Sequence, residues 1–155
     1  AEGPDLPNYG KWVVLESLGH YDTPDVRTWL LARIEKERDA GLFMSMAKAL
    51  ARLGEARGTD TVAQQLLRFE DGWRGVEWHL VHALGGMGGK EAVPHLVAFV
   101  GDERATEEVP VGYALDHLSR LDPEAAKRAA KALVETERFA SFSDRAKAHL
   151  GRYAK

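Results

Sequence analysis

The chain has 155 residues, of which 45% are hydrophobic and 29% are charged, and its formal net charge is −3. This length suits one folded domain with a real core, and the composition is not that of a disordered chain. The slightly acidic balance argues against a dedicated nucleic-acid binder, and no apolar run approaches the roughly 20 residues of a membrane span. The absence of cysteine excludes disulfides, thiolate metal sites and a cysteine nucleophile.

A short pattern recurs along the chain at a nearly constant interval. Leu-x-x-Leu-Gly occupies residues 15–19 and 50–54, and related patterns begin at residues 84, 118 and 150. The steps between their first residues are therefore 35, 34, 34 and 32 positions. A period of roughly 20 to 50 residues is typical of repeat proteins, in which each unit needs its neighbours to complete a core.

Each repeat predicts two helices, one before the pattern and one after it. Before the pattern, apolar residues recur every four positions, as at Val76, Leu80 and Leu84. After it come Gly and Pro turn signals, such as Asp122-Pro123, and then a second apolar stripe at helical spacing. No stretch alternates with period two, so no sheet is predicted. The expected repeats cover about residues 8–39, 42–71, 74–102 and 107–138, with a half repeat at 141–153.

The third repeat resembles a known family. Its segments Ala83-Leu84-Gly85, Ala92-Val93-Pro94-x-Leu96 and Asp102 resemble the short HEAT-like repeats first associated with phycobilisome lyases. Glu77 departs from that pattern, in which an Arg often stands at this place. The signatures of tetratricopeptide and ankyrin repeats, which have a similar length, are missing. The resemblance implies an all-α, right-handed α-α superhelix of the HEAT or armadillo type, with about 4.5 helix pairs in one domain over residues 1–155.

The resemblance also implies a binding groove, because the second helices of HEAT-like arrays usually line the concave face. The side chains expected to point into this groove are those of Arg27, Thr28, Leu31, Gln64, Leu67, His95, Arg128 and Lys131. The groove would grade from apolar to basic, which suits an extended peptide with an acidic end. The alternative is an ordinary solvated helix face, since exposed leucines are common.

The first helices present a second candidate surface, on the convex side. Tyr9, Met44, Trp78 and Tyr113 occupy equivalent repeat positions on these helices. They are expected to stack into an aromatic patch that is suited to a protein contact. On the same reasoning His82 is expected beside Asp116, and His79 beside Tyr113. His79, His82 and Asp116 could hold a zinc-type ion with an open position, although a simple His–Asp hydrogen bond is the commoner arrangement.

No catalytic set emerges, and no cofactor is predicted. The Gly-rich stretch that ends at Lys90 lacks the phosphate-loop spacing, since Glu91 follows the lysine, and no serine stands in a G-x-S-x-G elbow. The leading hypothesis is a scaffold module that binds a protein or peptide. A chain that starts at Ala1 without an initiator Met is expected to be processed or to belong to a longer array. The alternatives are a lyase-like or accessory domain of a larger enzyme and a weak nucleic-acid-binding module.

Overall fold

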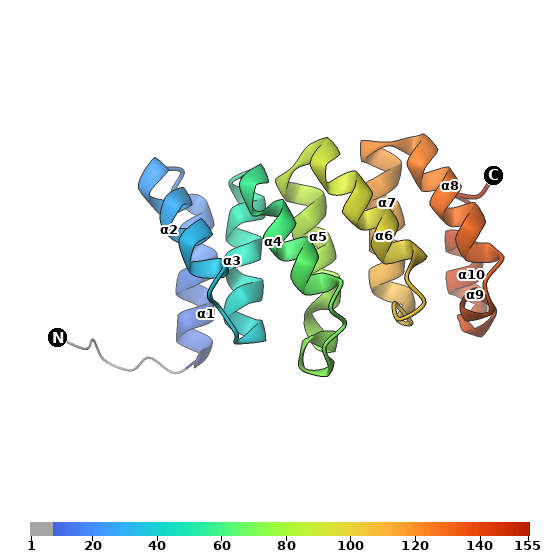
Figure 1. The fold of residues 1–155 in the computed structure, drawn as a ribbon, viewed down its shortest axis with the longest axis horizontal. Coiled ribbons are helices and arrows are strands. Elements are labelled where there is room, and N and C mark those ends of the chain that lie inside the picture. Colours follow the sequence, from blue (N-terminus) through green and yellow to red (C-terminus); the bar gives the residue numbers. More distant parts are fainter. Residues whose placement is uncertain (1–7) are drawn as a thin grey trace.

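The computed structural model describes residues 8–155 of the chain. Within this range the protein is all-α, with ten α-helices joined by short turns and 3-10 segments and with no strand. The helices pack in sequential pairs that lie side by side in chain order, with α1 at one end of the molecule and α10 at the other (Figure 1). The predicted all-α class with paired helices is thus confirmed. No helix in the described range is long and apolar enough to cross a membrane.

The helices of each pair differ in their neighbours. The first helices, each packed on the first helix of the next pair, are α1 (Asn8–Ser17), α3 (Ala40–Arg52), α5 (Glu77–Met87), α7 (Glu108–Leu121) and α10 (Asp144–Leu150). The second helices, which form the other layer in Figure 1, are α2 (Pro24–Ile34), α4 (Thr59–Leu66), α6 (Val93–Gly101) and α8 (Pro123–Val134). The short α9 (Glu137–Ser141) connects α8 to α10.

Polar caps define where several of these helices begin. The Asp39 carboxylate accepts a hydrogen bond from the amide of Leu42 at the start of α3, and the Asp122 carboxylate accepts one from Ala125 at the start of α8. Such caps satisfy amides that have no partner within the helix. Pro123 follows its cap as the first helical residue, where its missing N–H costs nothing. The turn signals of the sequence therefore act as helix starts.

The recurring leucines form the centre of the core. Leu50, Leu84, Leu118 and Leu150 are at most 1% exposed. The first helices approach closely because small residues line their contacts: a Cβ atom on Gly19 would lie 3.0 Å from the Cα atom of Ala49. This row of close contacts aligns the outer faces of α3, α5, α7 and α10 next to one another.

Polar side chains also join neighbouring pairs at about one repeat length. Examples are the hydrogen bonds of Lys48 with Glu16, 32 positions apart, of His95 with Asp60, 35 apart, and of Arg104 with the Leu67 carbonyl, 37 apart. Residues about one repeat length apart in the sequence are therefore neighbours in adjacent helix pairs.

Candidate functional site

The first helices carry a surface rich in rings and imidazoles, which we call the histidine face. It consists of Trp78, His79, His82, Val109, Tyr113, Asp116, His117, His149 and Tyr153. These residues come from α5 and α7, from α10 and from the turn that follows α10. Residues four apart share a helix face, which places Trp78 with His82 on α5 and Tyr113 with His117 on α7.

The rings of this face touch in a continuous row. The indole of Trp78 stacks on the imidazole of His79, with centroids 3.5 Å apart, and lies 6.2 Å from the ring of Tyr113. Tyr113 in turn lies 4.1 Å from His82. Of the predicted aromatic patch, the structure therefore brings Trp78 and Tyr113 together. Met44 is half-buried on α3, and the side chain of Tyr9 lies outside the described part of the chain.

A hydrogen-bonded pair of imidazoles lies beneath these rings. His82 Nδ1 is 2.9 Å from His117 Nε2, and His117 Nδ1 is 2.8 Å from a guanidinium nitrogen of Arg120. A guanidinium can only donate, so Nδ1 of His117 accepts and its Nε2 donates to His82. Burial lowers the pKa of His117 to about 4 and also lowers the pKa of His82. Both imidazoles are therefore neutral at pH 7.

Asp116 is the anionic centre of the face. It accepts a hydrogen bond from the Tyr153 hydroxyl, and its carboxylate lies 3.4 Å from His149 Nε2. Burial, followed by the contact with Asp116, raises the pKa of Tyr153 to about 12, so this phenol remains a donor. The carboxylate is thus held in a fixed position by groups on the last turn of the chain.

His82 lies near Asp116, its predicted neighbour, since both line one cavity between α5 and α7, but its hydrogen bond is with His117. The ring of His79 stacks on Trp78. The contact of His82 with His117 depends on Gly85, where a Cβ atom would lie 2.0 Å from His117 Nδ1. The missing side chain leaves room for the His117 ring to turn toward α5 and to meet His82. The described residues contain no group of three or more His, Asp or Glu side chains that could hold a metal ion.

Two adjoining cavities open on the histidine face. The α7–α10 cavity, of about 450 Å³, is lined by Glu108, Val109, Gly112, Tyr113, Asp116, Arg145, Ala146 and His149. The α5–α7 cavity, of about 380 Å³, is lined by His82, Tyr113, Asp116, His117, Ser119 and Arg120. Tyr113 and Asp116 line both, so the two cavities adjoin at these residues.

Two members of the predicted groove on the second helices, Arg27 and His95, already form polar contacts within the protein. Arg27 donates to Asp22, to Glu55 and to the Leu53 carbonyl, and His95 contacts Asp60. Leu31 and Leu67 are half-buried and pack against the core. The members that remain exposed are Thr28, Gln64, Arg128 and Lys131.

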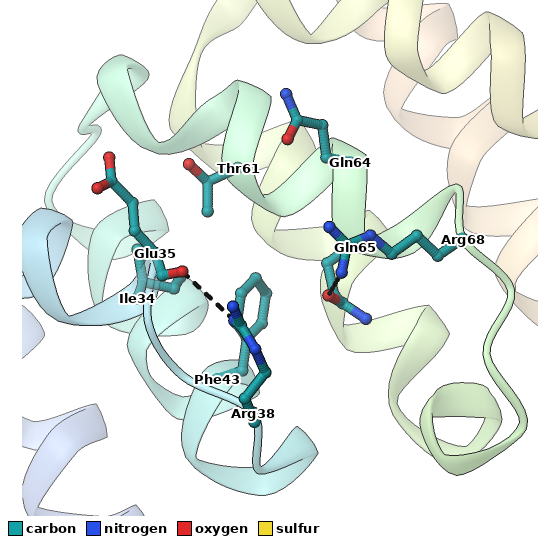
Figure 2. Close-up of a pocket in the computed structure, with 8 residues that line it drawn as sticks. All are labelled: Ile34, Glu35, Arg38, Phe43, Thr61, Gln64, Gln65 and Arg68. Atoms are coloured by element: carbon teal, nitrogen blue, oxygen red, sulfur yellow. Dashed lines mark hydrogen bonds between the residues drawn. The ribbon is translucent and has the colours of Figure 1, made fainter.

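A smaller cavity of about 320 Å³ does lie on this side, and we call it the α2–α4 pocket (Figure 2). Buried Ile34 and Phe43 line it together with Glu35, Arg38, Thr61, Gln64, Gln65 and Arg68. Arg38 donates to the carbonyls of Glu35 and Glu37, and Arg68 donates to Gln65 at 3.4 Å. The guanidinium groups of this pocket therefore already donate hydrogen bonds to acceptors within the protein.

The residues of the histidine face that the sequence-based prediction missed are Val109, His117, His149 and Tyr153. His117 and His149 share a repeat position, directly before the recurring leucine, which is the signal that could have linked them. Comparison of the chain with protein-family models, with curated proteins and with solved structures found no match. The function is therefore inferred from the geometry of the histidine face and of the α2–α4 pocket.

Proposed function

We propose that the chain is a HEAT-like repeat module, wound as a right-handed superhelix, whose histidine face binds a protein or peptide partner. The helix pairs in chain order, the recurring pattern and the bonds between pairs at 32 to 37 positions support the repeat architecture. The likeness of residues 76–102 to HEAT-like repeats supports its type. Stacked repeats expose long continuous faces, which are suited to extended partners.

The observation that carries the proposal is the pair of adjoining cavities that share Tyr113 and Asp116. Val109, which lines the α7–α10 cavity, is 55% exposed, and Trp78, whose ring lies 6.2 Å from that of Tyr113, is 39% exposed. Aromatic rings beside hollows are the features that most often carry the binding energy of protein interfaces. The polar groups below are already hydrogen-bonded, so a partner would meet an ordered surface.

The other candidate surfaces have weaker support. On the second helices, Arg27 and His95 already form hydrogen bonds with Glu55 and Asp60 of the neighbouring pair. Nucleic-acid binding would need a basic strip made of Arg27, Arg33, Lys36, Lys127, Arg128 and Lys131. Two of these residues, Arg27 and Arg33, form ion pairs with Glu55 and Glu37, and cations that are paired within the protein attract phosphates less.

A peptide selection tests the proposal. Peptides that bind the immobilised protein are enriched from a randomised display library and then measured against two variants. Trp78→Ala/Val109→Ser removes two exposed apolar groups from the histidine face, whereas the matched control Thr28→Ala/Gln64→Ala changes two exposed positions on the second helices. All four side chains are exposed, so both variants should keep the helical circular dichroism of the parent.

The expected result is at least about a 10-fold loss of affinity for the histidine-face variant, because one lost anchor is worth more than about 1.4 kcal/mol. The control should bind as the parent does. The reverse pattern would move the site to the α2–α4 pocket, and a library that yields no binder would remove the peptide-binding function.

A further inference from the structure

The α7–α10 cavity has a chemical character that identifies a ligand. Gly112 and Ala146, which have no long side chain, are among its lining residues. A Cβ atom on Gly112 would lie in ordinary van der Waals contact with the side chain of Leu150, at 3.7 Å, so this part of the wall is closely packed behind the glycine. Val109, which also lines the cavity, has an exposed apolar surface. Small and apolar side chains in the lining leave room for an aliphatic chain against this wall.

Carboxylates stand at the two ends of the hollow. Glu108 and Asp116 are eight positions apart on α7, about 12 Å along the helix axis at 1.5 Å per residue. Glu108 accepts hydrogen bonds from the amide of Ser143 at 2.9 Å and from its hydroxyl at 3.1 Å, and Asp116 accepts one from Tyr153. These donors fix both carboxylates in place. An ionised carboxylate has roughly four acceptor sites, so each retains capacity for a further donor.

The remaining groups of the wall favour a cation as well. The Tyr113 ring, which is half-buried between the two cavities, offers a face to which a cation is attracted. Among its Asp, Glu, Lys and Arg side chains, the lining has two anionic carboxylates, Glu108 and Asp116, and one cationic guanidinium, that of Arg145. Arg145 is exposed on α10 and forms no ion pair with the described residues. An anionic ligand would have to approach both carboxylates, which costs free energy.

We propose that this cavity takes an arginine side chain of the partner, with its aliphatic stem over Gly112 and Ala146 and its guanidinium toward a carboxylate and Tyr113. The inference rests on the proposed function and narrows it to partners with a basic segment. Arginine is preferred over lysine because its planar group donates two parallel hydrogen bonds to a carboxylate and stacks on a ring.

The probe is a capped tripeptide, acetyl-Gly-Arg-Gly-amide, titrated into the isotope-labelled protein and followed by NMR. Its matched control replaces arginine with citrulline, which has the same shape and no charge. The arginine peptide should bind at least about 10-fold more tightly than the citrulline peptide. Asp116→Asn, which retains an acceptor for Tyr153, and Glu108→Gln should each weaken the arginine peptide by about 3- to 10-fold.

One further variant keeps the test decisive if the charge variants are poorly folded. Arg145→Ala removes the exposed competing cation and should tighten binding of the arginine peptide. Equal binding of arginine and citrulline peptides, no binding of either, or no effect of Arg145→Ala would overturn the inference. Peptides from the selection could lack basic residues and still bind Trp78→Ala/Val109→Ser more weakly than the parent. That result would support the proposed function and contradict the arginine site.

Discussion

At the scale of single residues, Gly85 and His117 depend on each other. The His117 imidazole occupies the space where a side chain on Gly85 would be, since a Cβ atom there would lie 2.0 Å from Nδ1 and 2.2 Å from Cγ. The ring is 8% exposed, and both of its nitrogens have partners. This contact, not the average repeat spacing, decides which side chain meets His82.

Gly85→Ala should lower the free energy of unfolding by about 1–3 kcal/mol, because the added methyl group displaces the His117 ring. Alanine alone would favour the helix by about 1 kcal/mol over glycine. In a His117→Ala background the same change should therefore be neutral or stabilising. Denaturant unfolding of the parent, of Gly85→Ala, of His117→Ala and of the double variant measures the coupling free energy between the two positions. The control is Gly101→Ala, where a Cβ atom meets open space. Additive effects of the two substitutions would contradict the contact.

The depressed pKa of His117 makes stability depend on pH. The folded state titrates near pH 4 and the unfolded state near pH 6.5, so between these values the unfolded chain binds more protons. The stabilisation is present above pH 6.5 and is lost as the pH falls toward 4. From pH 6.5 to 4.5 the free energy of unfolding should fall by about 2 kcal/mol through this group.

His117→Gln supplies the control for this pH dependence, since glutamine does not titrate but can still hydrogen-bond. Urea unfolding at several pH values should give a flatter profile for the variant over this range. The same slope in both proteins would show that His117 is not the group responsible.

Sequence reasoning placed Trp78 and Tyr113 on one patch, because equivalent repeat positions fall side by side. It could not predict the hydrogen bond of His82 with His117, because His117 and the predicted neighbour Asp116 differ by only one position in the sequence. This hydrogen bond depends on ring orientation and on the space left by Gly85, which no periodicity encodes.

At the scale of helices, the end of α6 is held by a residue from α9. The Arg138 guanidinium donates to the carbonyl of Val100, in the last turn of α6, and to those of Asp102 and Ala105 in the segment that follows. Burial lowers the pKa of Arg138, and its cationic form is compensated by these carbonyls and by the field of Asp102 and Glu103. The third and fourth pairs are joined in this way.

Arg138→Met should lower the free energy of unfolding by about 2–4 kcal/mol, since it removes the hydrogen bonds of the guanidinium to three backbone carbonyls. The methionine keeps much of the aliphatic stem, so the loss reports mainly on the hydrogen bonds. Arg128→Met, at an exposed position on α8, should change stability by less than about 0.5 kcal/mol. Thermal and chemical unfolding followed by circular dichroism makes the comparison. Equal effects of the two substitutions would show that Arg138 does not stabilise the end of α6.

The order and pairing of the long helices could be predicted, because each has an apolar stripe, a cap and a turn signal. The helix α9 was not predicted, since a five-residue segment is too short to display a helical period. The helix begins directly after Thr136, whose hydroxyl accepts a hydrogen bond from the Phe139 amide. Its second residue, Arg138, donates a hydrogen bond to the Ala105 carbonyl.

At the scale of the whole molecule, the two ends of the row differ. On the last pair, the polar residues Ser143, Asp144 and Arg145 are exposed. On the first pair, Val14 is 52% exposed and Trp29 is 49% exposed. A pair that packs on one side only has fewer stabilising contacts than a pair with two neighbours.

Amide hydrogen exchange should therefore be graded along the chain. Amides of α1 and α2 should exchange at least about 10-fold faster than those of α5 and α7, because a terminal pair can open without disrupting a second interface. Exchange measured by mass spectrometry on peptic fragments would detect the gradient. Uniform protection from α1 to α8 would indicate one cooperative unit instead of a row of coupled pairs.

The most direct test of the central claim is a map of where a selected peptide binds. Backbone amide shifts of the isotope-labelled protein are recorded by NMR before and after saturation with the peptide. The account predicts that the largest changes cluster on α5, α7 and α10 around Trp78, Tyr113 and His149. Changes that cluster instead on α2 and α4 around Gln64 and Arg68 would contradict it and place the binding site in the α2–α4 pocket.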